Sequence, residues 1–327
     1  MAIPKKIHFF WHSAPPYPDK VNRCIESWKK MMPDYEIKAW NINSVDLNML
    51  IYTKQAMICK EYAFISDVIR LYALYTEGGI YFDTDVEVFK SFDDLLDQKS
   101  FMGIECTGKV GTCVIGSEKG NPVIKEFLDY YKDHLFIKED GNMEKVANTI
   151  PITRILFTHG LKIEDRIQFL KNITIYPESY FCPKFYWESE IKRTSYTYCV
   201  HHFDGSWNDN AKVDLPYIAN VPKMLADMIN KNPKVAVGQS EIIIYGTGDV
   251  GVHVLRLLRS NYPKVKCNCF MVTKNDTLCH DIYGMPIIEI NQATQKQKDA
   301  LVIVATTPKY HEVIIKTLKE NNFEYIY

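Results

Sequence analysis

Two aspartates, Asp83 and Asp85, stand two residues apart just after the apolar run Gly-Gly-Ile-Tyr-Phe. On an extended backbone, residues two apart point to the same side, so we expect both carboxylates to face one point. Two like charges held that close are unstable unless one is protonated or a cation lies between them. Oxygen ligands suit hard divalent ions that keep room for phosphate oxygens. The pair therefore predicts a Mn²⁺ or Mg²⁺ site that receives a diphosphate.

The helix predicted before this run also carries charge. Asp67 and Arg70 lie three residues apart, on one face of a helix whose other residues are apolar almost all round. The alternative is a surface ion pair that contributes well under ~1 kcal/mol. Asp-x-Asp alone is a weak motif, but charges on a buried helix are normally paired or directed into a site. Together the two features indicate a functional site.

The order Ser66-Asp67-x-x-Arg70, Leu-Tyr, Gly-Gly-Ile-Tyr-Phe-Asp-x-Asp-Val resembles the core signature of the family-32 glycosyltransferases. This Asp-x-Asp group includes initiating α-1,6-mannosyltransferases and many bacterial polysaccharide enzymes, and the glucosylating domains of the large clostridial toxins carry a related version. Residues 3–11 resemble the family's opening strand, and residues 201–207, His-His-Phe-Asp-Gly-Ser-Trp, resemble its closing motif. The resemblance covers about residues 1–210 and leaves the rest of the chain unexplained.

The resemblance implies a role for each residue of the signature. Asp85 would ligate the metal directly, whereas Asp83 would contact the donor ribose and reach the metal through water. Tyr81 would lie beside the donor sugar or its phosphate. Asp67 and Arg70 would bind donor-sugar hydroxyls, with Arg70 also near the diphosphate, which suits a planar group with several donors. The expected catalytic residues are thus Asp67, Arg70, Asp83 and Asp85.

The two ends of the resembling region complete the expected site. Trp11 would stack on the donor base, the alternative being a core tryptophan. His201 and His202 are adjacent, so on a strand they point opposite ways and only one can bind the metal. We favour His202, because the sequence that follows it resembles the His-x-x-Gly metal motif of other retaining transferases. Ser206 and Trp207 would lie near the diphosphate.

The expected reaction moves a hexose-type sugar from a nucleotide-sugar donor, with a UDP-sugar favoured, to a saccharide or lipid-linked saccharide acceptor. By resemblance it retains the anomeric configuration and serves bacterial capsule, lipopolysaccharide or exopolysaccharide synthesis. No second carboxylate stands in an obvious nucleophile position, which favours front-face displacement. The alternative is a regulatory protein that binds nucleotide sugars through a degenerate transferase half. The intact acidic and arginine residues argue against that alternative.

Composition narrows the function classes further. The 39 basic and 40 acidic residues give no reason to expect nucleic-acid binding. No stretch approaches the length of a membrane-spanning helix. Nine cysteines, without a Cys-x-x-Cys pair, are typical of reduced thiols in a cytosol. We therefore expect a cytoplasmic protein, peripheral at the inner membrane face if it meets lipid-linked acceptors. The sequence allows a homo-oligomer.

The expected fold is α/β. Strands alternating with helices predict a mixed sheet flanked by helices, of the GT-A type by resemblance, with a site at the carboxyl ends of the strands. A change of composition places the boundary between two domains, 1–234 and 235–327. We predict strands at 6–11, 35–41, 80–82, 101–105, 112–116, 173–176 and 196–203, and helices at 20–32, 55–77, 122–134, 143–158 (kinked at Pro151) and 222–230.

The second domain opens on a glycine-rich turn. Gly246, Gly248 and Gly251 form a Gly-x-Gly-x-x-Gly pattern between an apolar strand, 241–245, and a predicted helix. This is typical of a small Rossmann-like unit that binds a nucleotide or a phosphate. The next strand ends on Thr273 and not on the acid that would hold an adenine ribose, which argues against NAD. The alternative is that the glycines serve only the tight turn.

Overall fold

The computed structural model describes residues 2–105, 108–204, 209–275, 278–324 and 326–327. It divides into two compact units. The first comprises Met1–Leu161 and Asp165–Trp207, and the second comprises Lys162–Glu164 and Asn208–Tyr327. Each unit is described separately below.

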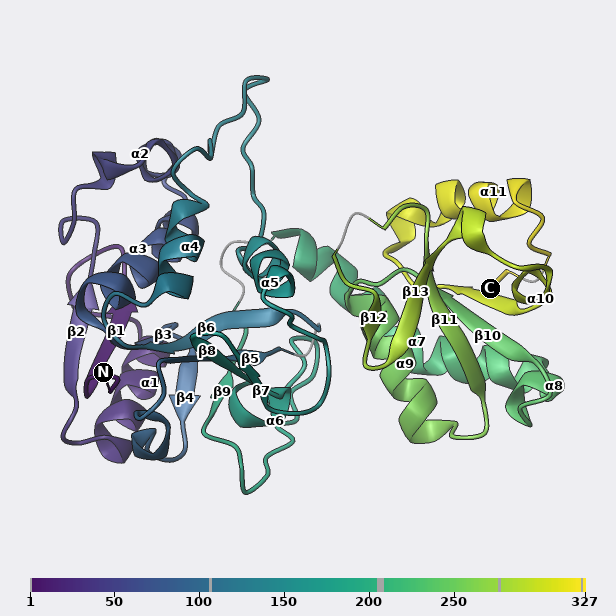
Figure 1. Ribbon diagram of the computed structural model, residues 1–327, viewed down its shortest axis with the longest axis horizontal. Helices are drawn as coiled ribbons and strands as arrows, with labels where there is room; N and C mark the ends of the chain where they lie inside the picture. The colour runs from purple at the N-terminus through teal and green to yellow at the C-terminus, as the bar shows by residue number, and fades with distance from the viewer. Residues whose placement is uncertain (1, 106–107, 205–208, 276–277, 325) are drawn as a thin grey trace. The chain divides into compact units, whose positions relative to one another are not determined.

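The first unit contains a seven-stranded mixed sheet in the order β2-β1-β3-β6-β5-β8-β7 (Figure 1). The pairs β1–β2, β1–β3 and β5–β8 are parallel, and the pairs β3–β6, β5–β6 and β7–β8 are antiparallel. The strands are β1 (Lys6–Phe10), β2 (Glu36–Trp40), β3 (Gly79–Phe82), β5 (Ser100–Ile104), β6 (Val110–Ser117), β7 (Gln168–Leu170) and β8 (Ile173–Tyr176).

Helices cover both faces of this sheet. Ile7 and Phe82, on one face, join a buried core with Trp28 of helix α1. On the other face α3 packs against β1, β3 and β6. The mixed α/β architecture with flanking helices is therefore confirmed. The helices are α1 (Asp19–Met31), α2 (Ile51–Ile58), α3 (Tyr62–Glu77), α4 (Pro122–Asp129), α5 (Thr149–Thr158) and α6 (Glu178–Phe181).

A separate two-stranded sheet lies beside the expected site. It pairs β4 (Val86–Val88) with β9 (Cys199–His201) in antiparallel register, so that Val86 stands opposite His201. Since β3 ends at Phe82, Asp83 and Asp85 lie in the turn between β3 and β4 and not along one strand. A hydrogen bond from the Val86 N–H to the Asp83 carbonyl closes that turn.

Three predicted elements differ in the structure. The helix expected over 55–77 is two helices, because the chain turns at Lys60, whose φ is +58°. The helix expected over 143–158 begins only at Thr149, so Pro151 lies in its first turn, where a proline costs no hydrogen bond. The helix expected over 122–134 is α4, which ends at Asp129, and Asn121 caps its beginning by accepting a hydrogen bond from the Val123 N–H.

The second unit contains a five-stranded sheet in the order β12-β13-β11-β10-β14, parallel except for β12. The predicted strand–glycine turn–helix–strand unit is present as β10, α9 and β11. The strands are β10 (Glu241–Tyr245), β11 (Lys266–Val272), β12 (Asp281–Ile282), β13 (Met285–Glu289) and β14 (Leu301–Val304). The helices are α7 (Asp209–Lys231), α8 (Pro233–Ala236), α9 (Asp249–Asn261), α10 (Gln295–Lys298) and α11 (His311–Glu320).

Helix α7 differs from the prediction in length and in grouping. It contains Pro216 and Pro222 in its interior, so Pro222 does not mark its beginning. It also packs against α9 and belongs to the second unit. The composition change placed the same residues in the first domain, up to residue 234.

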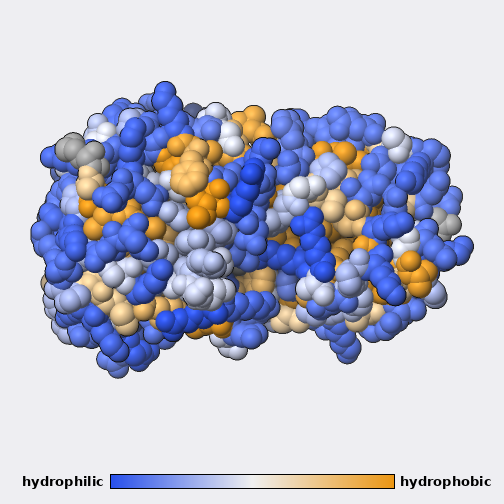
Figure 2. Space-filling view, turned by 60° about the horizontal axis from the view of Figure 1, so that its bottom comes forward, coloured by the Kyte–Doolittle hydropathy of each residue, from blue (hydrophilic) through white to orange (hydrophobic). Residues whose placement is uncertain are grey.

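The described surface has no dominant apolar area on the face shown in Figure 2, where small hydrophobic patches are separated by hydrophilic residues. Large exposed hydrophobic side chains such as Ile58, Phe169 and Val313 are dispersed along the described chain. Every described helix is too short or too polar to cross a bilayer.

Candidate functional site

Arg70 is the most heavily bonded side chain of the site, and only 4% of it is exposed. Its Nη2 lies 2.9 Å from Asp67 Oδ1 and donates to Ser66 Oγ at 3.0 Å. Its Nη1 donates to the Thr112 carbonyl at 2.8 Å and to Asp83 at 3.3 Å. Its Nε donates to the Ser66 carbonyl at 3.3 Å. Arginine has five N–H donors, and these contacts occupy all of them.

Those contacts join three elements at one corner. Arg70 and Asp67 come from α3, Thr112 from β6, and Asp83 from the turn after β3. The buried ring of Tyr81 lies under the guanidinium, with 4.9 Å between the Arg70 Cζ and the ring centroid. Arg70 therefore holds Asp83 in place against the sheet.

Asp85 is held from the other side by β9 and the residues after it. Its Oδ1 lies 3.2 Å from His201 Nε2, and its Oδ2 accepts a hydrogen bond of 2.9 Å from the Asp204 N–H. The register that places His201 opposite Val86 brings the imidazole to the Asp83–Asp85 turn. One ligand atom from each of Asp83, Asp85 and His201 lies within 4.8 Å of the other two.

His202 does not belong to this group, which corrects the histidine preferred from the sequence. Its Nε2 lies 3.0 Å from Glu87 Oε2, on the opposite side of β9. Adjacent residues of a strand point to opposite faces, so only one histidine could face the carboxylates. The resemblance of the following residues to a His-x-x-Gly motif did not reveal which one.

The two carboxylates differ in electrostatics. Burial raises the pKa of Asp83, an effect that Asp85 reinforces and Arg70 opposes. Burial would also raise the pKa of Asp85, but the charge of His201 and the hydrogen bonds from His201 and the Asp204 N–H lower it below its ordinary value. The pair is therefore asymmetric, as expected for two acids that share one site without a cation.

Two carboxylates and an imidazole match the ligand chemistry of Mn²⁺ and also accept Mg²⁺. Asp83, Asp85 and His201 are the residues that could hold such an ion. Among the described residues, the structure thus brings together the two carboxylates that the sequence singled out and one of the two candidate histidines, His201 on β9. Ser206 and Trp207, expected near the diphosphate, lie outside the described residues.

Four of these site residues lie in a part of the chain that matches a known protein family. Residues 18–102, which contain Asp67, Arg70, Asp83 and Asp85, match the family model described as a glycosyltransferase sugar-binding region containing the DXD motif. The chain contains a DXD-type glycosyltransferase region. The resemblance drawn from the sequence is thereby confirmed.

Relatives of the glycosyltransferase region come from fungi and bacteria. The chain is 30% identical over 133 residues to inositol phosphoceramide mannosyltransferase 3 of Schizosaccharomyces pombe, covering 39% of this chain and 36% of that protein. It is 26% identical over 200 residues to subversion of eukaryotic traffic protein A of Legionella pneumophila, covering 46% of this chain and 30% of that protein. The chain thus spans about a third of the length of these curated relatives.

Two solved structures are also similar to the chain. The PaToxG glycosyltransferase is 23% identical with a TM-score of 0.33, and the match covers 39% of this chain and 59% of that one. The glycosyltransferase GlyE of Streptococcus pneumoniae is 13% identical with a TM-score of 0.36, and the match covers 99% of this chain and 95% of that one.

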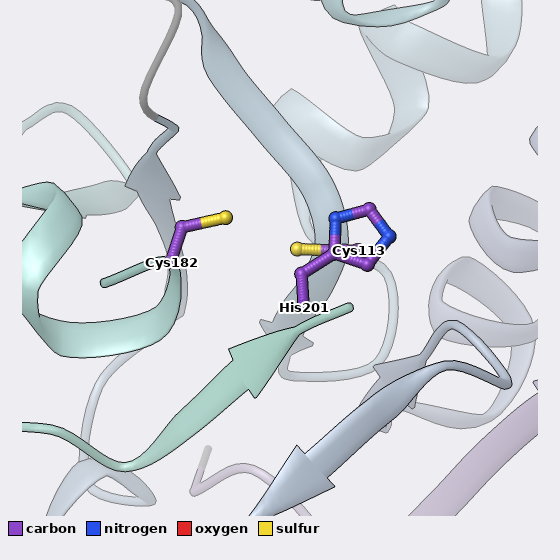
Figure 3. Close-up of side chains that lie close together, drawn as sticks. All are labelled: Cys113, Cys182 and His201. Carbon is purple, nitrogen blue, oxygen red and sulfur yellow. The ribbon is translucent and has the colours of Figure 1, made fainter. Parts of the chain in front are cut away.

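Two residues beside the glycosyltransferase region's carboxylates were missed by sequence reasoning. The thiols of Cys113 on β6 and Cys182 after α6 lie with His201 in a second group whose ligand atoms are within 4.8 Å of one another (Figure 3). The hydrogen bond with Cys182 and the charge of His201 lower the pKa of Cys113 to about 7, although burial opposes the shift. The sequence held no signal for this pair, because its members come from separate elements 69 positions apart and form no Cys-x-x-Cys motif.

Trp11 is partly buried and packs against the hydrophobic core of the first unit, with its ring 5.3 Å from that of His12. This packing agrees with the alternative that Trp11 is a core tryptophan. Its stacking on a donor base stays a prediction.

In the second unit, backbone geometry accounts for two of the three motif glycines. Gly246 has φ +111°, a conformation that favours glycine. A Cβ on Gly251 would lie 2.0 Å from the Gly246 carbonyl oxygen, so the helix can approach the turn only with glycine there. A Cβ on Gly248 would meet no described atom within 4 Å. Only Gly248 is left without a packing reason.

Proposed function

We propose that this chain is a metal-dependent, retaining glycosyltransferase that moves a hexose-type sugar from a nucleotide-sugar donor, with a UDP-sugar favoured, to a saccharide or lipid-linked saccharide acceptor. The observation that carries the proposal is the convergence of Asp83, Asp85 and His201 at one point, where both aspartates belong to the residues 18–102 that match the DXD glycosyltransferases. The similarity to a protein named a mannosyltransferase supports a hexose as the transferred group.

The chain's own residues suggest how the reaction is organised. Asp83, Asp85 and His201 would hold Mn²⁺ or Mg²⁺, and such an ion, when bound, offsets the charge that develops on a departing diphosphate. Arg70 fixes the Asp83 carboxylate through its bonds to Ser66 and Thr112, so that the ligand set is preorganised. Its buried positive charge also favours an anionic donor at this corner.

Asp67 would complete the donor site. Asp67 is 8% exposed and lies on the same turn of α3 as Arg70. A carboxylate there can accept hydrogen bonds from sugar hydroxyls, and a hydroxyl that satisfies it compensates for the burial of its charge. Tyr81, which is buried beneath Arg70, would support the donor site from below more than contact the donor.

The stereochemical course and the biological setting belong to the proposal as well. Resemblance to retaining transferases supports front-face displacement, in which the departing phosphate takes the proton of the acceptor hydroxyl. We place the reaction in bacterial capsule, lipopolysaccharide or exopolysaccharide synthesis on the cytoplasmic side of the membrane. The described cysteines form no disulfide, which supports a reducing compartment.

The test is donor turnover by the purified full chain. UDP- and GDP-hexoses are incubated with and without Mn²⁺, and release of the nucleoside diphosphate is measured together with the anomer of the released or transferred sugar by NMR. We expect Mn²⁺-dependent release from one donor and a product with the anomeric configuration of the donor. Tight donor binding without turnover under any metal would instead support the regulatory alternative, and an inverted product would refute retention.

For the second unit we propose binding of a nucleotide or a sugar phosphate at the open side of Gly248. The support is the space above Gly248 at the beginning of α9, where backbone N–H groups favour an anion. The hydroxyls of Thr306 and Thr307 are buried without a hydrogen bond in the described structure, and the Thr306 methyl group lies close to Gly246. Isothermal titration with nucleotides and nucleotide sugars tests this site.

A further inference from the structure

The cysteine–histidine group beside the carboxylates has the composition of a soft metal site. Cys113 lies on β6, Cys182 follows α6, and His201 ends β9, so three separate elements converge. The two cysteines are 4% and 2% exposed, and the His201 side chain is 16% exposed. In the view of Figure 3 the Cys113 sulfur lies between the Cys182 sulfur and the His201 imidazole, and the Cys182 sulfur points toward both. His201 is thus the most exposed of the three side chains.

The spacing of the group is close to what a tetrahedral ion requires. Zinc binds sulfur at about 2.3 Å and imidazole nitrogen at about 2.0–2.1 Å, so two thiolates on one ion are about 3.8 Å apart. The ligand atoms of Cys113, Cys182 and His201 already lie within 4.8 Å of one another. Two thiols and one imidazole leave a fourth position for water.

The orientation of His201 supports the same conclusion. Its Nε2 lies 3.2 Å from Asp85 Oδ1, whereas its buried Nδ1 makes no hydrogen bond among the described residues. A histidine that binds a metal through one ring nitrogen usually donates the other N–H to a carboxylate. Asp85 provides that carboxylate, and in Figure 3 one ring nitrogen lies on the side of the Cys113 sulfur.

We propose that Cys113, Cys182 and His201 form a binding site for Zn²⁺ or a similarly thiophilic divalent ion, and that its occupation excludes the hard ion from the carboxylates. In the zinc-bound arrangement, His201 Nε2 carries a hydrogen and donates a hydrogen bond to Asp85. That nitrogen can then no longer ligate a second cation, and both oxygens of Asp85 are engaged, one by His201 and the other by the Asp204 N–H. Zinc binding stands independently of the proposed function, whereas the exclusion rests on it.

Metal binding to the full-length chain tests the site directly. After removal of metals by a chelator and dialysis, Zn²⁺ is titrated calorimetrically into the wild type and into Cys113→Ser and Cys182→Ser. The matched control is Cys24→Ser, another buried thiol of the same hydrophobic core. We expect one Zn²⁺ per chain, affinity at least about tenfold weaker in the two site variants, and unchanged affinity in the control. Equal affinity in all four proteins would overturn the proposal.

Spectroscopy decides the matter even where a serine variant fails to fold. Co²⁺ in the wild-type site is expected to give a thiolate-to-metal charge-transfer band, and X-ray absorption of the zinc form is expected to show sulfur neighbours at about 2.3 Å. A zinc shell of oxygen and nitrogen alone would refute the site.

The exclusion has its own readout. One equivalent of Zn²⁺ added before saturating Mn²⁺ is expected to lower donor turnover at least tenfold in the wild type and to leave the turnover of Cys113→Ser unchanged. Equal inhibition of both proteins would refute exclusion through this site. If zinc-free protein shows no Mn²⁺-dependent turnover, the transferase proposal is refuted. The zinc titration would still test the zinc site independently.

Discussion

The carboxylate corner of the first unit, defined by Asp67, Arg70, Asp83, Asp85 and His201, and the glycine-rich turn of the second unit both match short sequence motifs. The structure accounts for them differently. The corner buries charges that packing does not require, and removing charge from water costs free energy that apolar residues would not incur. The turn needs Gly246 and Gly251 simply to bring a helix close to a strand. A motif that is costly to fold is therefore stronger evidence of function than a motif that folding itself demands.

The largest effect is expected from Asp85→Ala. The change removes one proposed metal ligand and the partner of His201, so Mn²⁺-dependent donor turnover should fall at least about 100-fold while the fold stays intact. Steady-state release of nucleoside diphosphate measures turnover, and circular dichroism checks the fold. The matched control is Asp97→Ala, an exposed acid of the same unit. Full turnover by the Asp85 variant would remove the metal role of the corner.

In the second unit the largest effect is expected from Gly251→Ala. The added Cβ would lie 2.0 Å from a backbone oxygen, so α9 must move away from the turn, at a cost of about 2–4 kcal/mol in the unfolding free energy of this unit. Hydrogen exchange of the α9 and β10 amides measures it. Because every tryptophan of the chain lies at or before residue 207, fluorescence reports the first unit separately. We expect that signal and donor turnover to stay at wild-type values, and loss of turnover would contradict the packing explanation.

Arg70→Lys separates charge from geometry at the corner. Lysine keeps the positive charge but has three donors and no planar fork, so it cannot hold Ser66, Thr112 and Asp83 together. We expect turnover to fall about 10–100-fold and Mn²⁺ affinity to weaken. Titration of Mn²⁺ by electron paramagnetic resonance measures the affinity. Wild-type Mn²⁺ affinity combined with reduced turnover would show that Arg70 acts on the donor and not on the position of Asp83.

The same comparison shows what the sequence could and could not predict. The buried charges of α3 and the Asp-x-Asp turn were predictable, because helical periodicity and two-residue spacing are local properties. The choice between His201 and His202 was not predictable. It depends on the register between β9 and β4, two strands that are more than 100 residues apart in the sequence. Cys113 and Cys182 likewise meet only through the packing of β6 and α6. Local patterns identified the chemistry, and tertiary pairing completed it.

Asp67→Asn measures the cost of a buried acid. Burial outweighs Arg70 and, with Asp83, raises the pKa of Asp67 from 3.8 to about 7. The native state therefore holds a proton that the unfolded chain has released, and the acid destabilises the first unit increasingly as pH rises from about 4 to about 7. Asparagine does not titrate, so the variant should gain about 1–4 kcal/mol relative to the wild type between pH 4 and pH 8. Urea unfolding followed by tryptophan fluorescence measures the unfolding free energies of the wild type and the variant. Parallel pH profiles of the two proteins would contradict the raised pKa of Asp67.

Gly248→Ala is expected to have the smallest effect on stability and the most informative one on binding. Its Cβ meets no described atom within 4 Å. Because Gly248 is the N-cap of α9, where alanine is less favourable than glycine, the unfolding free energy of the second unit should fall by about 1 kcal/mol or less. If a nucleotide or sugar phosphate approaches the backbone at this point, the methyl group occupies the space of its phosphate, and calorimetric affinity should drop at least about tenfold. Gly284→Ala also adds a methyl group in open space but lies in the β12–β13 turn, at a φ of +72° that strains alanine, so it is a control for binding and not for stability. Unchanged affinity in Gly248→Ala would mean that all three glycines serve the turn alone. The glycine motif would then reflect folding only, in contrast to the carboxylate corner, whose buried charges indicate function.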